Sequence, residues 1–114
     1  MDEDKYIPQR RLYRTKIVMK SHTTGEYVLL ESGQKLLYGL KRKTCGDFGN
    51  CIIYKELTVS DLSSDHTGYI LELTTEETDL PLGTYYFDVA LQRADGELIP
   101  VVKCKEIQVT RSVV

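Results

Sequence analysis

Tryptophan is absent from this sequence of 114 residues, alanine occurs only twice, and basic residues are not in excess. Fifteen Lys and Arg residues stand against seventeen Asp and Glu residues, which removes the usual signature of nucleic-acid binding. The longest stretch without a charged residue is residues 80–87, and a spanning helix needs about 20 apolar residues, so we expect no membrane contact. Residues 1–5 lack the apolar segment of a signal peptide, so we expect no secretion.

The three cysteines, Cys45, Cys51 and Cys104, do not suggest a disulfide framework or a metal site. Their number is odd, and in a chain without a secretion signal this favours free thiols. Cys45 and Cys51 are too far apart for the C-x-x-C spacing of a zinc or redox motif. A local Cys45–Cys51 disulfide is the alternative. We expect neither a metal nor a cofactor.

The scarcity of alanine, together with abundant Val, Ile, Thr and Tyr, predicts β-structure along most of the chain. In residues 84–92 the side chains alternate between two faces, which is typical of a half-buried antiparallel strand. Asp95 and Gly96 then predict a tight hairpin leading into a strand over residues 98–110. Further strands are expected at residues 13–20, 36–41, 52–59 and 68–73.

The last predicted strand contains a break in its alternation. Lys103 and Lys105 lie at positions that strict alternation would direct into the core. Burying unpaired ammonium groups is costly, so we expect a β-bulge or a change of sheet between Val102 and Lys105. Pro100 lacks an N–H group, which favours a sheet edge for this strand.

These strands predict an all-β fold, an antiparallel β-sandwich of about seven strands in one domain over residues 12–114. Residues 1–11 are charged and unpatterned, so we expect them to form a mobile arm. Residues 74–78 predict one helical turn with Thr74 or Thr75 as its cap. The expected core consists of Ile17, Leu36, Tyr38, Leu40, Ile52, Leu71, Leu73, Tyr85, Phe87, Val89, Leu91, Ile107 and Val109.

No group of residues forms a recognised catalytic or metal-binding motif, and we expect a protein that is not an enzyme. Asp61, Asp65 and His66 share a loop, but they lack the residue order of a calcium loop and are typical of a solvated turn. His22 has no nucleophile elbow beside it. A small hydrolase built from His22, His66 and nearby acids is a rival hypothesis.

One basic cluster is formed by Arg10, Arg11 and Arg14. It could contact phosphates or an acidic partner, but the acidic residues 2–4 beside it favour a solvated lead-in to the first strand. Residues 46–49 resemble half of a glycine-rich phosphate loop. No helix follows them, so a hairpin tip is the better interpretation.

The order of these pieces resembles a known family. Residues 73–78 read Leu-Thr-Thr-Glu-Glu-Thr, residues 80–89 read Leu-Pro-Leu-Gly-Thr-Tyr-Tyr-Phe-Asp-Val, and residues 94–97 read Ala-Asp-Gly-Glu. This arrangement is similar to the immunoglobulin-like N-terminal domain of phage baseplate upper proteins and related small prophage tail proteins. The resemblance covers residues 13–111, but the Gly-Asp pair that often opens the family's domain is replaced here by residues 11–14.

The resemblance implies an immunoglobulin-like fold without catalytic residues. It implies a non-enzymatic structural role in the tail or baseplate of a phage or prophage virion, in a protein made in the cytoplasm of the bacterial host. The expected partners are other virion proteins or further copies of the chain. The alternative is a bacterial immunoglobulin-like module that binds a ligand such as a glycan.

Two surfaces are candidates for such contacts. The strand over residues 98–110 is expected to mediate self-association, because an edge-to-edge pair of strands can be self-complementary about a two-fold axis. The loops over residues 43–50 and 60–67 are expected to serve contacts with other proteins.

Overall fold

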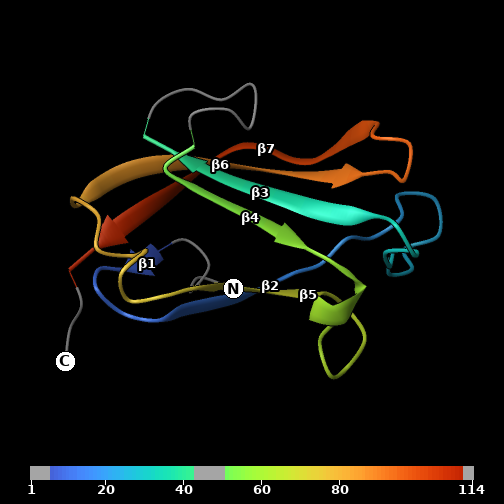
Figure 1. Ribbon diagram of the computed structural model, residues 1–114, viewed down its shortest axis with the longest axis horizontal. Helices are drawn as coiled ribbons and strands as arrows, with labels where there is room; N and C mark the ends of the chain where they lie inside the picture. Colours follow the sequence, from blue (N-terminus) through green and yellow to red (C-terminus); the bar gives the residue numbers. More distant parts are fainter. Residues whose placement is uncertain (1–5, 43–50, 112–114) are drawn as a thin grey trace.

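The computed structural model describes residues 6–42 and 51–111, which form two β-sheets and contain no α-helix (Figure 1). The all-β prediction is confirmed for this part of the chain. The elements in chain order are β1 (Tyr6–Pro8), β2 (Tyr13–Ile17), β3 (Lys35–Lys41), β4 (Ile53–Leu57), the 3-10 helix η2 (Val59–Asp61), β5 (Tyr69–Leu73), β6 (Gly83–Gln92) and β7 (Leu98–Thr110).

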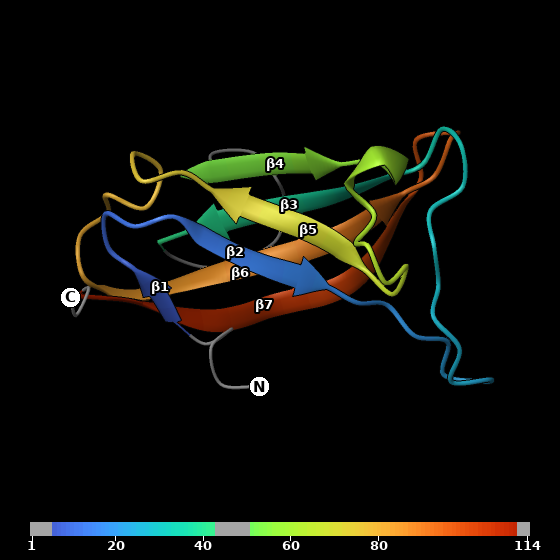
Figure 2. The ribbon, with the colours of Figure 1, turned by 90° about the horizontal axis from the view of Figure 1, so that it is seen from below.

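The larger sheet has the strand order β1-β7-β6-β3-β4, and the smaller sheet pairs β2 with β5. Figure 2 shows the β2–β5 pair lying across one face of the larger sheet. All strand pairs are antiparallel except β1 and β7, which run parallel with Tyr6 opposite Gln108. The larger sheet is therefore mixed, and the expectation of a purely antiparallel arrangement is wrong at β1.

The N-terminal segment differs from the expected mobile arm. Residues 6–8 form β1, and Ile7 is fully buried in the core. The Gln9 N–H group donates to the Thr110 carbonyl at 2.9 Å and extends the contact with β7 by one residue. The prediction of an arm is wrong from residue 6 onward, because a single buried isoleucine and its pairing to β7 hold this segment in place. Residues 1–5 lie outside the described residues.

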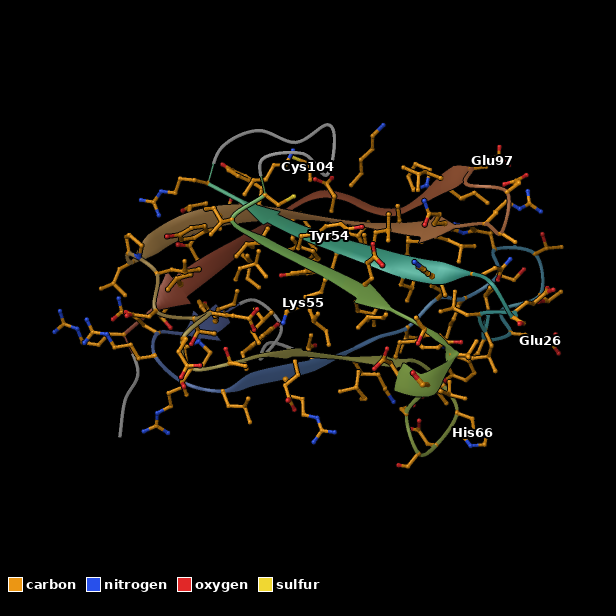
Figure 3. All side chains as sticks on the ribbon, in the orientation of Figure 1. Glu26, Tyr54, Lys55, His66, Glu97 and Cys104 are labelled. Carbon is orange, nitrogen blue, oxygen red and sulfur yellow. The ribbon has the colours of Figure 1, made fainter. Side chains whose placement is uncertain are left out.

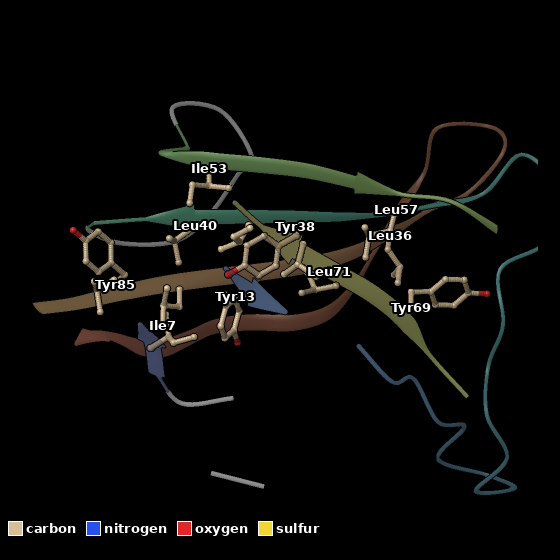
Figure 4. Close-up of a cluster of buried hydrophobic side chains, with 14 of the residues drawn as sticks. Ile7, Tyr13, Leu36, Tyr38, Leu40, Ile53, Leu57, Tyr69, Leu71 and Tyr85 are labelled. Carbon is tan, nitrogen blue, oxygen red and sulfur yellow. The ribbon is translucent and has the colours of Figure 1, made fainter. Parts of the chain in front are cut away.

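The hydrophobic core fills the space between the two sheets (Figure 4). Most of the predicted core is buried, namely Leu36, Tyr38, Leu40, Leu71, Leu73, Tyr85, Val89, Ile107 and Val109. Ile17, Phe87 and Leu91 are partly buried and pack against this cluster. Ile52 is exposed, so its placement in the core is wrong. The inward position belongs to Ile53, which lies opposite the buried Leu40 of β3.

The predicted bulge in the last strand is confirmed. Phe87 lies opposite Lys105 and Val89 lies opposite Val102, so β7 uses one more residue than β6 between the two pairs. Cys104, inside this interval, has a φ of 54°, the left-handed backbone that a bulge can require. The bulge returns Val102 to the inner face, where it packs against the core. Lys105 lies opposite Phe87 and therefore belongs to the inner face of the strand, but its side chain is exposed.

The cysteines do not follow the expectation of three free thiols. Cys104 is disulfide-bonded, and its N–H group donates to the Asp88 carboxylate at 2.8 Å. Cys51 carries a thiol that is not part of a disulfide, so the alternative of a Cys45–Cys51 bridge is wrong. Cys45 itself lies outside the described residues.

The connection between β5 and β6 contains the predicted helical turn. The Thr78 N–H group donates to the Thr74 carbonyl at 3.0 Å, which closes one turn of helix. Thr74 is its cap, because the Glu77 N–H group donates to the Thr74 hydroxyl at 3.2 Å and the Glu77 carboxylate accepts from the Thr74 N–H group at 2.9 Å. The turn places the fully buried Thr78 beside Arg11, and the Thr78 hydroxyl forms hydrogen bonds with the Arg11 backbone.

Candidate functional site

The loop containing Asp61, Asp65 and His66 is a hydrogen-bonded turn. Asp61 accepts from the Thr58 N–H group at 2.8 Å at the start of η2. Asp65 accepts from the Ser63 hydroxyl at 2.6 Å and from the Lys16 ammonium group at 3.0 Å. These bonds, with those from Thr67, hold the pKa of the Asp65 carboxyl well below its usual range. The two carboxylates are therefore occupied in shaping the turn.

His66 lies at the tip of this turn with a φ of 60°, and its side chain is exposed (Figure 3). His22 is also exposed but belongs to a different connection, the one between β2 and β3. Within residues 6–42 and 51–111, no three His, Cys, Asp or Glu side chains are grouped closely enough to hold a metal ion. The hydrolase hypothesis, which needs His22 and His66 with acids, gains no geometric support from this arrangement.

Two arginines of the basic cluster, Arg10 and Arg14, form ion pairs within the chain. Arg10 donates to Asp79 at 2.9 Å, and Arg14 lies 3.8 Å from Glu72 on the neighbouring strand β5. All four side chains are largely exposed, so each pair contributes little to stability. These pairs favour the interpretation of a charged lead-in to β2 over a phosphate site. Residues 46–49, the other phosphate-loop candidate, lie outside the described residues.

One edge of the larger sheet is only partly covered. β1 pairs with residues 108–110 of β7, and within the described part of the chain residues 98–107 have no strand on that side. Leu98 and Ile99 at the start of β7 are 46% and 38% exposed. Pro100 and Lys103, which guard an edge against indiscriminate pairing, follow them. The predicted edge position of β7 is thus confirmed for residues 98–107.

The same side of the molecule holds a cavity of about 150 Å³ between β2 and the β6–β7 pair. It lies where the outer edge of the β2–β5 sheet faces the larger sheet. Its apolar wall consists of Leu71, Phe87, Val89, Val102 and Ile107. The bulge in β7 contributes to this wall because it turns Val102 inward.

Tyr38 reaches the cavity from β3 and lies beside Tyr13 and Leu71 (Figure 4). Its side chain is 3% exposed, and the Phe87 ring packs against it with the ring centroids 5.5 Å apart. Burial, with a smaller contribution from Tyr13, raises the pKa of the Tyr38 phenol. The hydroxyl forms no hydrogen bond with any described residue. Since no fully enclosed side-chain oxygen in the described part of the chain lacks a partner, this hydroxyl is not fully enclosed, and Tyr38 lines the cavity.

Two lysines line the cavity and differ in their pairing. The Lys16 ammonium group is engaged by Asp65 at 3.0 Å and by the Thr67 hydroxyl at 2.8 Å. Lys105 is exposed and forms no ion pair with a described residue. None of the side chains that line the cavity is acidic. The site therefore combines an apolar wall, a buried phenol and a lysine that forms no ion pair within residues 6–42 and 51–111.

Sequence reasoning identified the parts of this site without bringing them together. Tyr38 and Phe87 were expected in the core, and Lys105 was recognised as a lysine at an inward position. Only the packing of β2 against β6 and β7 places them around one space. Nothing in the local pattern of the chain signals this packing, because β2 and β7 are not paired with each other.

Comparison of the chain with known proteins identifies no relative. The chain matches no family model, no curated protein and no solved structure. Within the described residues, no helix has the length and hydropathy that crossing a membrane requires.

Proposed function

We propose that this chain is a non-enzymatic structural protein of a phage or prophage tail or baseplate, and that it acts through protein–protein contacts in particle assembly. The motif resemblance over residues 73–97 supports the assignment to a virion. The uncovered edge of β7 supports the mode of action and is the observation that carries the proposal. The partners are other virion proteins or further copies of the chain, assembled after synthesis in the bacterial host cytoplasm.

The proposal includes a finer description of the fold, an immunoglobulin-like β-sandwich of about seven strands. Tyr85 supports it. Near the start of β6 its buried hydroxyl donates to the Pro81 carbonyl four residues earlier, at 2.7 Å. Immunoglobulin-like domains have a comparable tyrosine corner, in which a tyrosine at the start of a strand binds the backbone just upstream. Here the corner fixes the passage from the β2–β5 sheet to the larger sheet.

The β7 edge suits pairing between two copies of the chain. Residues 98–100 pair regularly with β6 on one side, and Leu98 and Ile99 add exposed apolar surface. An antiparallel pair of such edges is related by a two-fold axis, so each copy offers the other the same groups. The bulge and Lys103 interrupt regular pairing farther along β7, which limits the contact to its first residues.

Contacts through the loops receive less support. Residues 60–67 form the turn held by Asp65, Ser63 and Lys16, so this loop is preorganised instead of adaptable. The other proposed loop, residues 43–50, lies outside the described residues.

The edge contact is tested by static light scattering over a concentration series. The mass of the wild-type protein is expected to rise from 13.1 kDa toward twice that value. Leu98→Lys brings like charges together at the paired edge and should keep the protein monomeric. Leu82→Lys is the matched control, because Leu82 is similarly exposed (42%) but lies outside β7. A wild-type protein that stays monomeric to millimolar concentration, or equal effects of both substitutions, would rule out this contact.

The virion role is tested separately through the genes beside the one that encodes this chain. Genes for tail, tape-measure, holin or lysin proteins are expected there. A position among surface-adhesion genes would contradict the virion role and favour the ligand-binding module.

A further inference from the structure

The Tyr38 side chain is 3% exposed, and its hydroxyl, which is not fully enclosed, forms no hydrogen bond with a described residue. Buried hydroxyl groups are nearly always hydrogen-bonded, and leaving one unpaired is costly compared with phenylalanine at the same position. The Tyr38 ring packs against Phe87, Tyr38 lines the cavity, and its hydroxyl is not fully enclosed. The hydroxyl is therefore placed to bind a polar group of a molecule inside the cavity.

Lys105 supplies the second recognition group. It lies opposite Phe87, and directly opposed residues of an antiparallel pair project from the same face. Lys105 lines the cavity, and the residue as a whole is exposed. Because none of the lining side chains is acidic and Lys16 is already paired with Asp65, the cavity carries a net positive charge that an anion would neutralise.

The size of the cavity limits the body of a ligand. An apolar cavity of about 150 Å³ accommodates benzene, and this cavity has the same volume. Phe87, Val89 and Ile107 provide apolar contact for one ring. A larger ring system would have to extend into solvent.

From these observations we propose that the cavity between β2 and the β6–β7 pair binds a small hydroxyaromatic carboxylate. The ring lies against the apolar wall, the ring hydroxyl forms a hydrogen bond with Tyr38 at the buried end, and the carboxylate pairs with Lys105 at the open end. This site is independent of the proposed self-association, because neither Tyr38 nor Lys105 lies in the contact that begins at Leu98.

Binding is measured by NMR with 3-(4-hydroxyphenyl)propanoate as the probe. At 13.1 kDa the protein is small enough for methyl shifts of Leu71, Val89, Val102 and Ile107 to be followed during a titration. Two comparison probes each lack one group, namely 3-phenylpropanoate, without the hydroxyl, and 3-(4-hydroxyphenyl)propanamide, without the charge. We expect saturable shifts at these methyl groups, with a Kd for the full probe at least about threefold lower than for either comparison probe.

Two variants assign these preferences to residues. Tyr38→Phe should abolish the preference for the ring hydroxyl and leave the preference for the carboxylate. Lys105→Gln should abolish the preference for the carboxylate and leave the preference for the ring hydroxyl. The control Lys103→Gln lies on the same strand but outside the cavity lining, so it should change neither preference. Each variant keeps the shape of the residue it replaces, and its fold is checked by the dispersion of the same spectra.

Three results would overturn the assignment. They are the absence of saturable shifts at the cavity methyl groups, the absence of either preference in the wild-type protein, and the survival of a preference in the variant that should remove it. If Tyr38→Phe or Lys105→Gln fails to fold, the same probes are tested on Val102→Phe, which fills the cavity from its partly exposed wall. Unchanged binding to that variant would also overturn the site.

Discussion

Replacing Thr78 with valine removes a buried hydroxyl without changing the volume of the side chain. Thr78 is fully buried in the β5–β6 connection, and its hydroxyl serves both backbone groups of Arg11. It donates to the Arg11 carbonyl at 2.6 Å and accepts from the Arg11 N–H group at 2.9 Å. These two bonds fasten the segment between β1 and β2 to the turn over residues 74–78.

The expected loss of stability follows from those two bonds. Each contributes about 0.5–1.5 kcal/mol net, and the Arg11 groups left unpaired add a desolvation cost, so Thr78→Val should lower the free energy of unfolding by about 2–3 kcal/mol. Urea unfolding followed by tyrosine fluorescence measures this loss, since the chain has eight tyrosines and no tryptophan. The slope of the transition should stay the same, because the surface exposed on unfolding does not change.

Thr78→Ser is the control for this prediction. Serine keeps the hydroxyl and removes one methyl group, which should cost about 1 kcal/mol. The reasoning requires the valine variant to be less stable than the serine variant. If valine is tolerated as well as serine, or costs less than serine does, the hydroxyl does not fasten the two segments and the interpretation is wrong.

Two further predictions concern Tyr85 and Asp65. Tyr85→Phe removes the bond to the Pro81 carbonyl and should lower stability by about 1 kcal/mol in the same assay; an unchanged urea midpoint would argue against the tyrosine corner. The pKa of Asp65 is lower in the folded protein than in the unfolded chain, where it is about 3.9. The ionised carboxylate therefore stabilises the fold above this pH, and that stabilisation is lost as the pH falls below it. Asp65→Asn should therefore flatten the acid side of the stability curve, and an acid limb identical to that of the wild-type protein would show that the Asp65 turn does not contribute to it.

Local patterns predicted the elements that depend on neighbouring residues. The β6–β7 hairpin follows from the alternation before Asp95-Gly96 and the chemistry of that pair. The Thr74 cap follows from a threonine three residues before Glu77. The bulge was predictable because Lys103 and Lys105 conflict with the parity of Ile107. In each case a few adjacent residues are enough to predict the structural feature.

Features that depend on distant residues escaped prediction. β1 has only three residues, and its burial depends on pairing with β7 at the other end of the chain. Either Ile52 or Ile53 could face the core, because the two isoleucines are adjacent and point to opposite faces of the strand. Only the pairing of Ile53 with Leu40 decides which one is buried. The candidate ligand site depends on the packing of β2 over β6 and β7. Its residues were recognised one by one, but their common surroundings were not.

The parallel pairing of β1 with β7 has a consequence for the order in which the chain acquires its structure. Tyr6 and Gln108 are 102 positions apart, since 108 − 6 = 102, and they become neighbours in the larger sheet. A ribosome synthesises residue 6 long before residue 108, so Ile7 has no β7 strand to pack beside until residues 108–110 have also been made. Closing so long a loop adds little to the equilibrium cost but slows folding. The larger sheet is therefore completed late in folding, and until then the apolar residues that β1 and β7 bury together are exposed to aggregation.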